Sequence, residues 1–241
     1  MRADVFLVEK GYAASRAEAQ AAIEAGKVLA NGKPVAKSSQ QLSGAIQIEY
    51  APAHPYVSRG ALKLVAALDH FDLSPAGLIC LDLGASTGGF TEVLLERGAK
   101  KVFAVDVGQG QLHPKIANDP RVVSMEKLNA RELAYVHFSD PIEAIVADVS
   151  FISLSLALPS ALGIAASGAW LVALVKPQFE VGKAHVGKGG VVTDEAARLG
   201  ALASIADTIS SVCRWKVAGT IDSPIAGSDG NREYLIAARK P

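Results

Sequence analysis

The stretch Leu81-Asp82-Leu83-Gly84-Ala85-Ser86-Thr87-Gly88-Gly89-Phe90 contains the turn that decides the fold. The apolar run Leu78-Ile79-Cys80-Leu81 leads into it and is typical of a buried strand, and a helix is expected after it. Glycines in such a turn let the backbone approach a ligand closely. Open α/β sheets bind their ligands where a strand meets the following helix. We therefore expect a ligand-binding loop in an α/β domain.

Strands and helices alternate along the chain on both sides of this loop. The apolar runs predict strands over roughly 78–83, 101–106, 121–124, 143–148, 169–175, 215–221 and 233–239. Such alternation favours a doubly wound sheet. The sequence thus predicts an α/β fold with a mostly parallel, seven-stranded, Rossmann-like sheet in residues 58–241.

A helix is expected just before the first strand, with Ser58 as its N-cap. Its apolar positions on the core-facing side are Leu62, Val65, Leu68 and Phe71. Lys63 lies next to this apolar stripe, near the start of the helix.

The glycine-rich loop does not match a dinucleotide-binding fingerprint, because position 86 is Ser where Gly-x-Gly-x-x-Gly requires Gly. Asp82 would suit a ligand with a cationic amino group. Asp106, at the end of the second strand, is placed to accept hydrogen bonds from both ribose hydroxyls. S-adenosylmethionine has both features. Alone, Asp82 could be a turn carboxylate and Asp106 a strand terminator, but together they favour a methyltransferase.

Asn129, after the third strand, is placed to hydrogen-bond the adenine edge, although Asn at such a position is often only part of a turn. The full set of predicted cofactor-binding residues is Asp82, Gly84, Ala85, Ser86, Gly88, Gly89, Phe90, Asp106, Val107 and Asn129.

The composition allows one large core and a small second module in 241 residues, half of them hydrophobic. The 24 basic and 24 acidic residues balance, so the net charge neither supports nor excludes a nucleic-acid partner. Cys80 and Cys213 suggest neither a disulfide framework nor a metal cluster. The N-terminus, Met1-Arg2-Ala3-Asp4, leaves no room for a secretory signal, and we expect a cytoplasmic protein.

Residues 149–175 form an uncharged stretch that is longer than the ~20 residues needed to span a bilayer. Pro159, Gly163 and Gly168 interrupt it. We expect a helix, a turn at Ser167-Gly168 and a short buried strand rather than a membrane span.

Residues 1–50 predict a small separate domain of two helices and a hairpin. Gly11 and Gly26 suit the ends of the helices, and Ser15 with Glu18 has capping-box spacing at the start of the second. Asn31-Gly32 predicts the hairpin turn. Residues 51–57, with two prolines, are expected to be a linker.

This N-terminal segment resembles the S4 RNA-binding domain in the order and spacing of Ser15-Arg16, Gly26-Lys27-Val28 and Asn31-Gly32-Lys33. The resemblance implies a small α+β fold that lays a basic helix face against structured RNA. The alternative is a small helical cap with solvated lysines.

The residues at the predicted strand ends limit which kind of atom can accept the methyl group. Asp148-Val149-Ser150-Phe151 stands where methyltransferases of amino nitrogens often carry Asp/Asn-Pro-Pro-Tyr/Phe, which disfavours an amino target. Cytosine C-methylation needs a cysteine nucleophile, and neither Cys80 nor Cys213 lies at the carboxyl end of a strand. Two lysines and two carboxylates remain: Lys63, Asp148, Lys176 and Glu233. Such an acid-base group suits a ribose 2′-hydroxyl; the alternative is a pair of structural ion pairs.

From Tyr56-Val57-Ser58-Arg59-Gly60-Ala61-Leu62-Lys63 through the loop at 82–91 to Lys176-Pro177-Gln178-Phe179-Glu180, the chain resembles the TlyA family. Those proteins join an S4 domain to an FtsJ-like methyltransferase domain. The resemblance implies 2′-O-methylation of cytidine in 16S and/or 23S ribosomal RNA by a Lys-Asp-Lys-Glu tetrad, which falls on Lys63, Asp148, Lys176 and Glu233. One lysine would act as general base and the other would stabilise the oxyanion. Gly88 and Phe90 would line the cofactor.

Ribosomal RNA or an assembled ribosomal subunit is the implied partner. The basic residues expected to contact it are Arg2, Arg16, Lys27, Lys33, Arg59, Lys127, Lys183 and Lys188. Residues 181–190, flexible by composition, are expected to close over bound RNA. Two other functions stay open: a catalytically inactive ribosome assembly factor, and a haemolysin, a name that the family also carries.

Overall fold

The computed structural model describes residues 1–13, 15–44, 46–227 and 229–241. The chain divides into two compact units, Met1–Pro55 and Tyr56–Pro241. No helix of the described residues is long and apolar enough to cross a bilayer.

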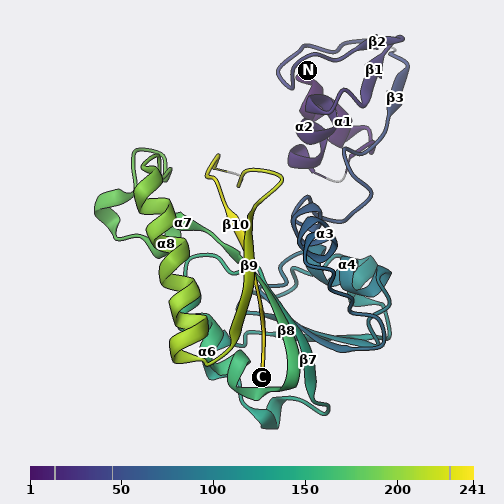
Figure 1. Ribbon diagram of the computed structural model, residues 1–241. Coiled ribbons are helices and arrows are strands. Elements are labelled where there is room, and N and C mark those ends of the chain that lie inside the picture. Colours follow the sequence, from purple (N-terminus) through teal and green to yellow (C-terminus); the bar gives the residue numbers. More distant parts are fainter. Residues whose placement is uncertain (14, 45, 228) are drawn as a thin grey trace. The chain divides into compact units, whose positions relative to one another are not determined.

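The first unit contains two helices and a three-stranded antiparallel sheet with the strand order β2-β1-β3 (Figure 1). Its elements are α1 (Ala3–Glu9), α2 (Arg16–Glu24), β1 (Val28–Ala30), β2 (Lys33–Pro34) and β3 (Ile48–Tyr50). Ser15 Oγ accepts a hydrogen bond from Glu18 N at 3.2 Å, and Asn31 and Gly32 both have positive φ, 50° and 72°. The predicted N-cap and hairpin turn are confirmed.

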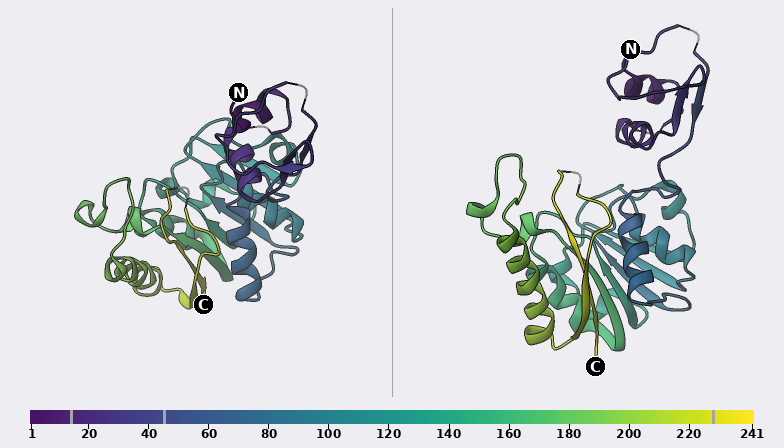
Figure 2. Two further views of the ribbon diagram at one scale, coloured as in Figure 1. Left: turned by 90° about the horizontal axis from the view of Figure 1, so that it is seen from above. Right: turned by 45° about the horizontal axis from the view of Figure 1, so that its top comes forward.

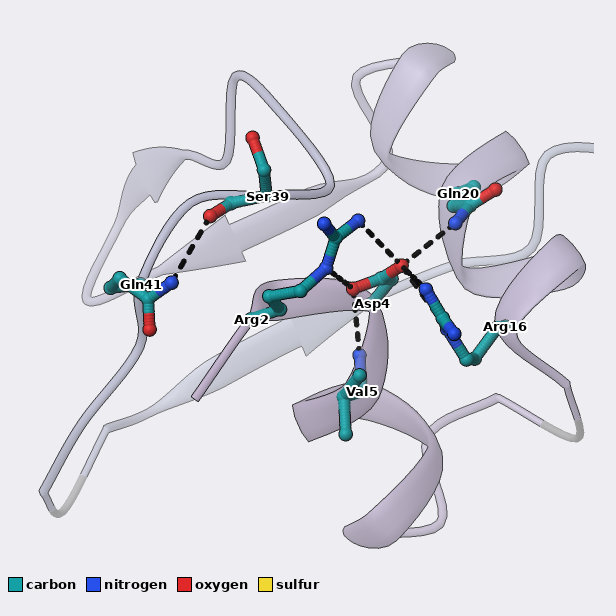
Figure 3. Close-up of polar contacts among 7 residues, drawn as sticks. All are labelled: Arg2, Asp4, Val5, Arg16, Gln20, Ser39 and Gln41. Atoms are coloured by element: carbon teal, nitrogen blue, oxygen red, sulfur yellow. Dashed lines mark hydrogen bonds and ion pairs between the residues drawn. The ribbon is translucent and has the colours of Figure 1, made fainter.

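A charged cluster joins α1 to α2 in this unit (Figure 3). Asp4 has no exposed surface, because the side chains of its partners cover it. Its carboxylate accepts hydrogen bonds from Arg2 Nε at 3.0 Å, Arg16 Nη2 at 3.0 Å, Gln20 Nε2 at 2.7 Å and Val5 N at 3.0 Å. We call Arg2, Asp4, Arg16 and Gln20 the Asp4 cluster.

The second unit is built on a seven-stranded sheet with the order β6-β5-β4-β7-β8-β10-β9. The strands are β4 (Ile79–Leu83), β5 (Lys101–Asp106), β6 (Val122–Glu126), β7 (Ile142–Ala147), β8 (Ala165–Val175), β9 (Lys216–Asp222) and β10 (Tyr234–Arg239). Strands β4, β5, β6, β7 and β8 are parallel to one another, and β10 runs antiparallel to both β8 and β9. The predicted doubly wound, mostly parallel sheet is confirmed.

Helices cover both faces of this sheet (Figures 1 and 2). They are α3 (Ala61–His70), α4 (Gly89–Glu96), α5 (Pro114–Ala117), α6 (Leu154–Ile164), α7 (Pro177–Glu180) and α8 (Glu195–Asp207), with a π-helix at Thr208–Val212 and 3-10 turns at Ala130–Glu132, Tyr135–His137 and Lys183–His185. Side chains of α3 and α4 form one hydrophobic core with one face of the sheet, and those of α6 and α8 form a second core with the other face. The carboxyl ends of the parallel strands are left for the loops that build the site.

Two local predictions differ from the structure. Ser58 does not cap α3; its Oγ accepts from Gly60 N at 3.2 Å, and the helix begins at Ala61. The buried face of α3 is therefore rotated: Leu64 and Lys63 are buried, whereas Leu62 and Val65 are only half-buried.

The expected turn at Ser167-Gly168 lies inside β8 instead of before it. Ile142 pairs with Ala165 and Ala144 with Trp170, so the register shifts and the extra residues bulge out of the sheet. Gly168 has φ +79°, which suits glycine in such an irregular segment.

Candidate active site

The glycine-rich loop connects β4 to α4 and lies against the end of β7. Gly84, Ser86 and Gly88 all have positive φ, at 78°, 47° and 94°. A β-carbon on Gly84 would lie 2.7 Å from the backbone oxygen of Asp148. Because of this close approach, only glycine fits position 84 without moving the chain after β7.

A cavity of about 490 Å³ opens above this loop, at the carboxyl ends of β4, β5 and β7. Its walls combine backbone, carboxylates and apolar side chains. They are formed by Gly84, Ser86, Val105, Asp106, Val107, Gln111, Leu128, Asn129, Ala130, Asp148, Val149, Ser150, Phe151 and Ile152. Of the predicted cofactor residues, this cavity includes Gly84, Ser86, Asp106, Val107 and Asn129. We call it the cofactor cavity.

Asp106 and Asn129 both line the cofactor cavity and both serve the backbone. Asp106 accepts from Ser86 N at 2.9 Å and from Gly108 N at 2.7 Å. Asn129 Oδ1 accepts from Arg131 N at 3.1 Å and caps the 3-10 turn that follows. Asp106 thus fixes the conformation of the two loops that flank it, and Asn129 has the turn role that the sequence left open as an alternative.

Asp82 does not line the cofactor cavity. It has no exposed surface, and its Oδ2 accepts from Thr91 Oγ1 at 2.6 Å. Its Oδ1 has no hydrogen-bond partner among the described residues. Burial, with the nearby charges of Asp148 and Asp106, raises the pKa of this carboxyl to about 7. Asp82 therefore supports the loop from beneath.

The other predicted cofactor residues that lie outside the walls of the cavity are Ala85, Gly88, Gly89 and Phe90. Phe90 is 3% exposed and belongs to the core on the α3 and α4 side. Gly88 is the N-cap of α4. These residues shape the turn, since their side chains or Cα atoms pack against protein.

The four predicted catalytic residues come together in two ion pairs, which we call the lysine tetrad. Lys63 of α3 contacts Glu233, which precedes β10, through Nζ and Oε2. Lys176, at the end of β8, places Nζ 2.6 Å from Asp148 Oδ1 and donates a hydrogen bond to Ser150 Oγ at 2.8 Å. The side chains of Lys63 and Lys176 are only 7% and 11% exposed.

A second cavity, of about 350 Å³, adjoins the cofactor cavity and shares Ser150 and Phe151 with it. We call it the acceptor cavity. It is lined by Ser150, Phe151, Lys176, Gln178, Phe179, Val186, Gly190, Asp229 and Glu233. Lys176 and Glu233 thus face it, Asp148 faces the cofactor cavity, and Lys63 lines neither.

Sequence reasoning missed the aromatic residues of the acceptor cavity. Phe151 has φ +66° and is 92% exposed, and its ring centroid lies 5.3 Å from that of Phe179. An aromatic residue three positions after the carboxylate that follows β7 could have been noted in the sequence. Its exposure depends on a left-handed backbone that the sequence pattern does not indicate.

All eight basic residues predicted to contact RNA are exposed. Arg2 and Arg16 are also members of the Asp4 cluster, and their side chains remain 44% and 58% exposed. Arg59 Nη2 donates to the backbone oxygen of Ala226 at 3.3 Å. Within the residues that the structure describes, no group of His, Cys, Asp and Glu could hold a metal ion.

Comparison with known proteins adds the family. Residues 56–240 match the model of the FtsJ-like methyltransferases, and residues 1–45 match the S4 domain. The chain is 47% identical over 240 residues to the 16S/23S rRNA (cytidine-2'-O)-methyltransferase TlyA of Mycobacterium tuberculosis, a match that covers 99% of this chain and 89% of that protein. The chain belongs to the TlyA family.

Two further TlyA-family matches extend over nearly the whole chain. Hemolysin A of Brachyspira hyodysenteriae is 42% identical over 236 residues, which are 98% of each protein. A solved Streptococcus thermophilus structure that carries the name hemolysin is 39% identical, with a TM-score of 0.78, and the match covers 100% of this chain and 88% of that one. The predicted S4 and FtsJ-like resemblances are confirmed.

The cofactor of this TlyA-family domain is S-adenosylmethionine, and the residues of the cofactor cavity fit it. The absence of a β-carbon at Gly84 leaves the backbone open at the floor. Asp106 places a carboxylate at the end of β5, where ribose hydroxyls can donate to it. Val107, Leu128 and Ile152 supply apolar wall for a flat base.

Proposed function

We propose that this chain transfers the methyl group of S-adenosylmethionine to the 2′-hydroxyl of a cytidine in 16S and/or 23S ribosomal RNA. The observation that carries the proposal is the position of the lysine tetrad between two adjoining cavities. Asp148 lines one cavity, Lys176 and Glu233 line the other, and both cavities share Ser150 and Phe151. A methyl donor in the first cavity and a ribose in the second would meet beside Lys176.

The cofactor would be held by the residues around the cofactor cavity. Asp106 would accept from the ribose hydroxyls, and the walls at Val107 and Ile152 would flank the adenine. When bound, S-adenosylmethionine supplies an electrophilic methyl group on a sulfonium. Because Asp82 lies beneath the loop, its contribution is to hold the loop through Thr91.

Lys176 is the residue that would act on the 2′-hydroxyl. It lines the acceptor cavity, and its Nζ is fixed by Ser150 Oγ at 2.8 Å and Asp148 Oδ1 at 2.6 Å. An ammonium or amine carries several hydrogen-bonding directions, so one can point into the cavity. In its neutral amine form, Lys176 Nζ would take the hydroxyl proton through its lone pair as the oxygen attacks the methyl carbon. Asp148 and Ser150 orient that nitrogen.

Lys63 would be a positioning residue. It lines neither cavity, and its ion pair with Glu233 is almost wholly buried. The pair holds the Glu233 carboxylate at the wall of the acceptor cavity, where it can accept a hydrogen bond from the ribose or from Lys176. The intact tetrad disfavours the alternative of an inactive assembly factor.

Ribosomal RNA would be bound by both units. Their exposed basic side chains can contact phosphates, and the S4 match supports this for the first unit. Lys183 and Lys188 lie in the segment 181–190 that follows α7, which would cover RNA once bound. We place the reaction in the cytoplasm, where ribosomes assemble.

The test is transfer of labelled methyl from S-adenosylmethionine to purified ribosomal subunits that lack the modification, with mass spectrometry of the released nucleosides. The expected product is 2′-O-methylcytidine, absent with Lys176→Ala and present with Lys100→Ala, an exposed lysine before β5. A base-methylated nucleoside would refute the role of the lysine tetrad. Cofactor binding without any product on either subunit would favour the assembly-factor alternative, and lysis of red cells by the purified protein would favour the haemolysin.

A further inference from the structure

Two polar side chains form part of the wall of the acceptor cavity and take no part in the lysine tetrad. Gln178 lies in α7, two residues after Lys176, and Asp229 lies in the loop before β10. Gln178 Nε2 donates to Asp229 Oδ2 at 3.2 Å, and Asp229 Oδ1 accepts from Asn231 N at 3.1 Å. The two side chains are thus fixed relative to each other.

The contact with Asp229 also fixes the orientation of the Gln178 amide. A carboxylate only accepts hydrogen bonds, so the amide must turn its nitrogen toward Asp229 and its oxygen away. Gln178 Oε1 is buried and has no hydrogen-bond partner among the described residues. A buried acceptor without a donor is costly and calls for a partner.

Gly227 lies beside both Asp229 and Glu233, the carboxylate of the lysine tetrad. A β-carbon built on Gly227 would lie 2.7 Å from Glu233 Oε1 and 2.9 Å from Asp229 Oδ1. Both oxygens therefore occupy the space that a side chain at position 227 would need. One ligand in the acceptor cavity can meet Glu233 with one part and the acceptors of Asp229 and Gln178 with another.

We propose that Asp229 and Gln178 select the nucleobase of the target nucleotide by accepting hydrogen bonds from its exocyclic amino group. The inference rests on the proposed function, because it assumes that the ribose of the same nucleotide lies at Lys176. Cytosine N4 carries two N–H donors, which matches two acceptor side chains. Uracil presents an oxygen at that position and would face the Asp229 carboxylate without a hydrogen bond, so it is rejected.

The experiment compares ribosomal subunits carrying the target cytidine with subunits carrying uridine at the same position. Each well-formed base contact is worth about 1–3 kcal/mol, or roughly 5–150-fold. We expect kcat/KM of the unmodified protein to favour cytidine by at least about tenfold. Asp229→Asn keeps an acceptor for Asn231 N and places an N–H group where Asp229 Oδ2 accepted from Gln178 Nε2, so the Gln178 amide must turn. The pair then offers an N–H that can donate to uracil O4, and the preference should fall about tenfold or more.

Two further variants make the result specific. Gln178→Met removes the unpartnered oxygen at similar side-chain size and should also lower the preference for cytidine, which covers the case in which Asp229→Asn misfolds. Asp222→Asn, an exposed carboxylate at the end of β9, should leave the preference unchanged. Cofactor affinity, measured by calorimetry, should be the same in all three variants.

The outcomes separate this inference from the proposed function. Equal preference for cytidine in the unmodified protein, Asp229→Asn and Gln178→Met would overturn the selection role and leave 2′-O-methylation standing. Equal methylation of cytidine and uridine by the unmodified protein would do the same. Failure of the unmodified protein to methylate the cytidine-bearing subunit would overturn the proposed function itself, and this inference with it.

Discussion

The Asp4 cluster of the first unit and the lysine tetrad of the second contain the same kinds of charge in opposite arrangements. In the Asp4 cluster the carboxylate has no exposed surface, and the two arginines are 44% and 58% exposed. In the lysine tetrad the lysines are covered, at 7% and 11% exposed, while the Asp148 side chain is 24% exposed. One arrangement buries an anion beneath its cations, and the other buries its cations and places one of them, Lys176, at a cavity.

This difference is the one expected between a structural cluster and the cluster that we propose to be catalytic. Four donor groups, from Arg2, Arg16, Gln20 and the Val5 backbone, bind the Asp4 carboxylate, so it has little capacity left for a ligand. Lys176 has two fixed partners and faces the acceptor cavity. Arginine always keeps its proton, whereas lysine can release one. Burial, residual hydrogen-bonding capacity and residue type together support the proposal that chemistry takes place at Lys176.

Exchanging lysine and arginine in the two clusters tests this comparison with the largest expected effect. Lys176→Arg keeps the charge beside Asp148 but cannot take a proton, so the rate of methyl transfer should fall about 10²–10⁴-fold. The reciprocal change, Arg16→Lys, should leave the rate at saturating RNA within about twofold, because Arg16 lies outside the lysine tetrad and saturation offsets any weaker contact with RNA. Single-turnover transfer with excess enzyme measures both. A Lys176→Arg protein with an unchanged rate would show that the charge alone matters.

Gly227→Ala should disturb the lysine tetrad without removing any of its charges. The new methyl group would displace Glu233 Oε1 and Asp229 Oδ1, which lie 2.7 and 2.9 Å from its position. Misplacement of a catalytic group on this scale costs on the order of 10²-fold in kcat/KM. The matched control is Gly200→Ala in α8, where no atom of the described residues lies within 4 Å of the added carbon. Equal activity of the two alanine variants would mean that Glu233 needs no fixed position.

The fold could be predicted because its determinants are local. Apolar runs of strand length alternate with helices, and all seven predicted strands are present within a few residues. The lysine tetrad could also be located, because Asp148 and Lys176 directly follow parallel strands and Glu233 directly precedes the antiparallel β10, so all three lie at one edge of the sheet. Lys63 could be located because it lies near the start of α3. Its burial was not predicted, because α3 begins at Ala61 and not at Ser58, and a different face of the helix packs against the core.

The direction of Asp82 and the walls of the acceptor cavity could not be predicted in the same way. Asp82 alternates with Leu81 and Leu83 on β4 and so shares its face with Cys80, which packs in the core with α4. Because of this alternation along the strand, the Asp82 carboxylate points toward Thr91 and away from the cofactor cavity. Gln178 of α7 meets Asp229 of a loop that is distant in sequence, and no periodic pattern specifies how that loop folds back.

Asp4→Asn should weaken the first unit more than it affects the second. The side-chain hydrogen bond from Arg2, followed by those from Gln20 and Arg16, holds the pKa of Asp4 well below its ordinary value. Such a carboxylate stabilises the fold above its unfolded-state pKa, and this contribution is lost as pH falls through the folded pKa. At pH 7 the variant should lower the melting transition of the first unit by roughly 5–10 °C. The difference should shrink below about pH 4; a constant difference at all pH values would point to packing instead.

Asp82→Asn should have the smallest effect on stability, with a pH dependence opposite to that of Asp4→Asn. Burial raises the pKa of Asp82 to about 7, so the folded state retains a proton that the unfolded state has already lost. The stability from this group is therefore present below the unfolded-state pKa and is lost as pH rises through about 7. Between pH 6 and 7 the second unit should lose about 1 kcal/mol, a melting shift of roughly 2–4 °C. Asp82→Asn, which can still accept from Thr91, should remove this slope, whereas Glu96→Gln on the exposed end of α4 should keep it. If calorimetric melting of Asp82→Asn retained the slope, the buried charge would lie on another residue, and the contrast between a saturated Asp4 and an unsaturated Asp82 would not hold.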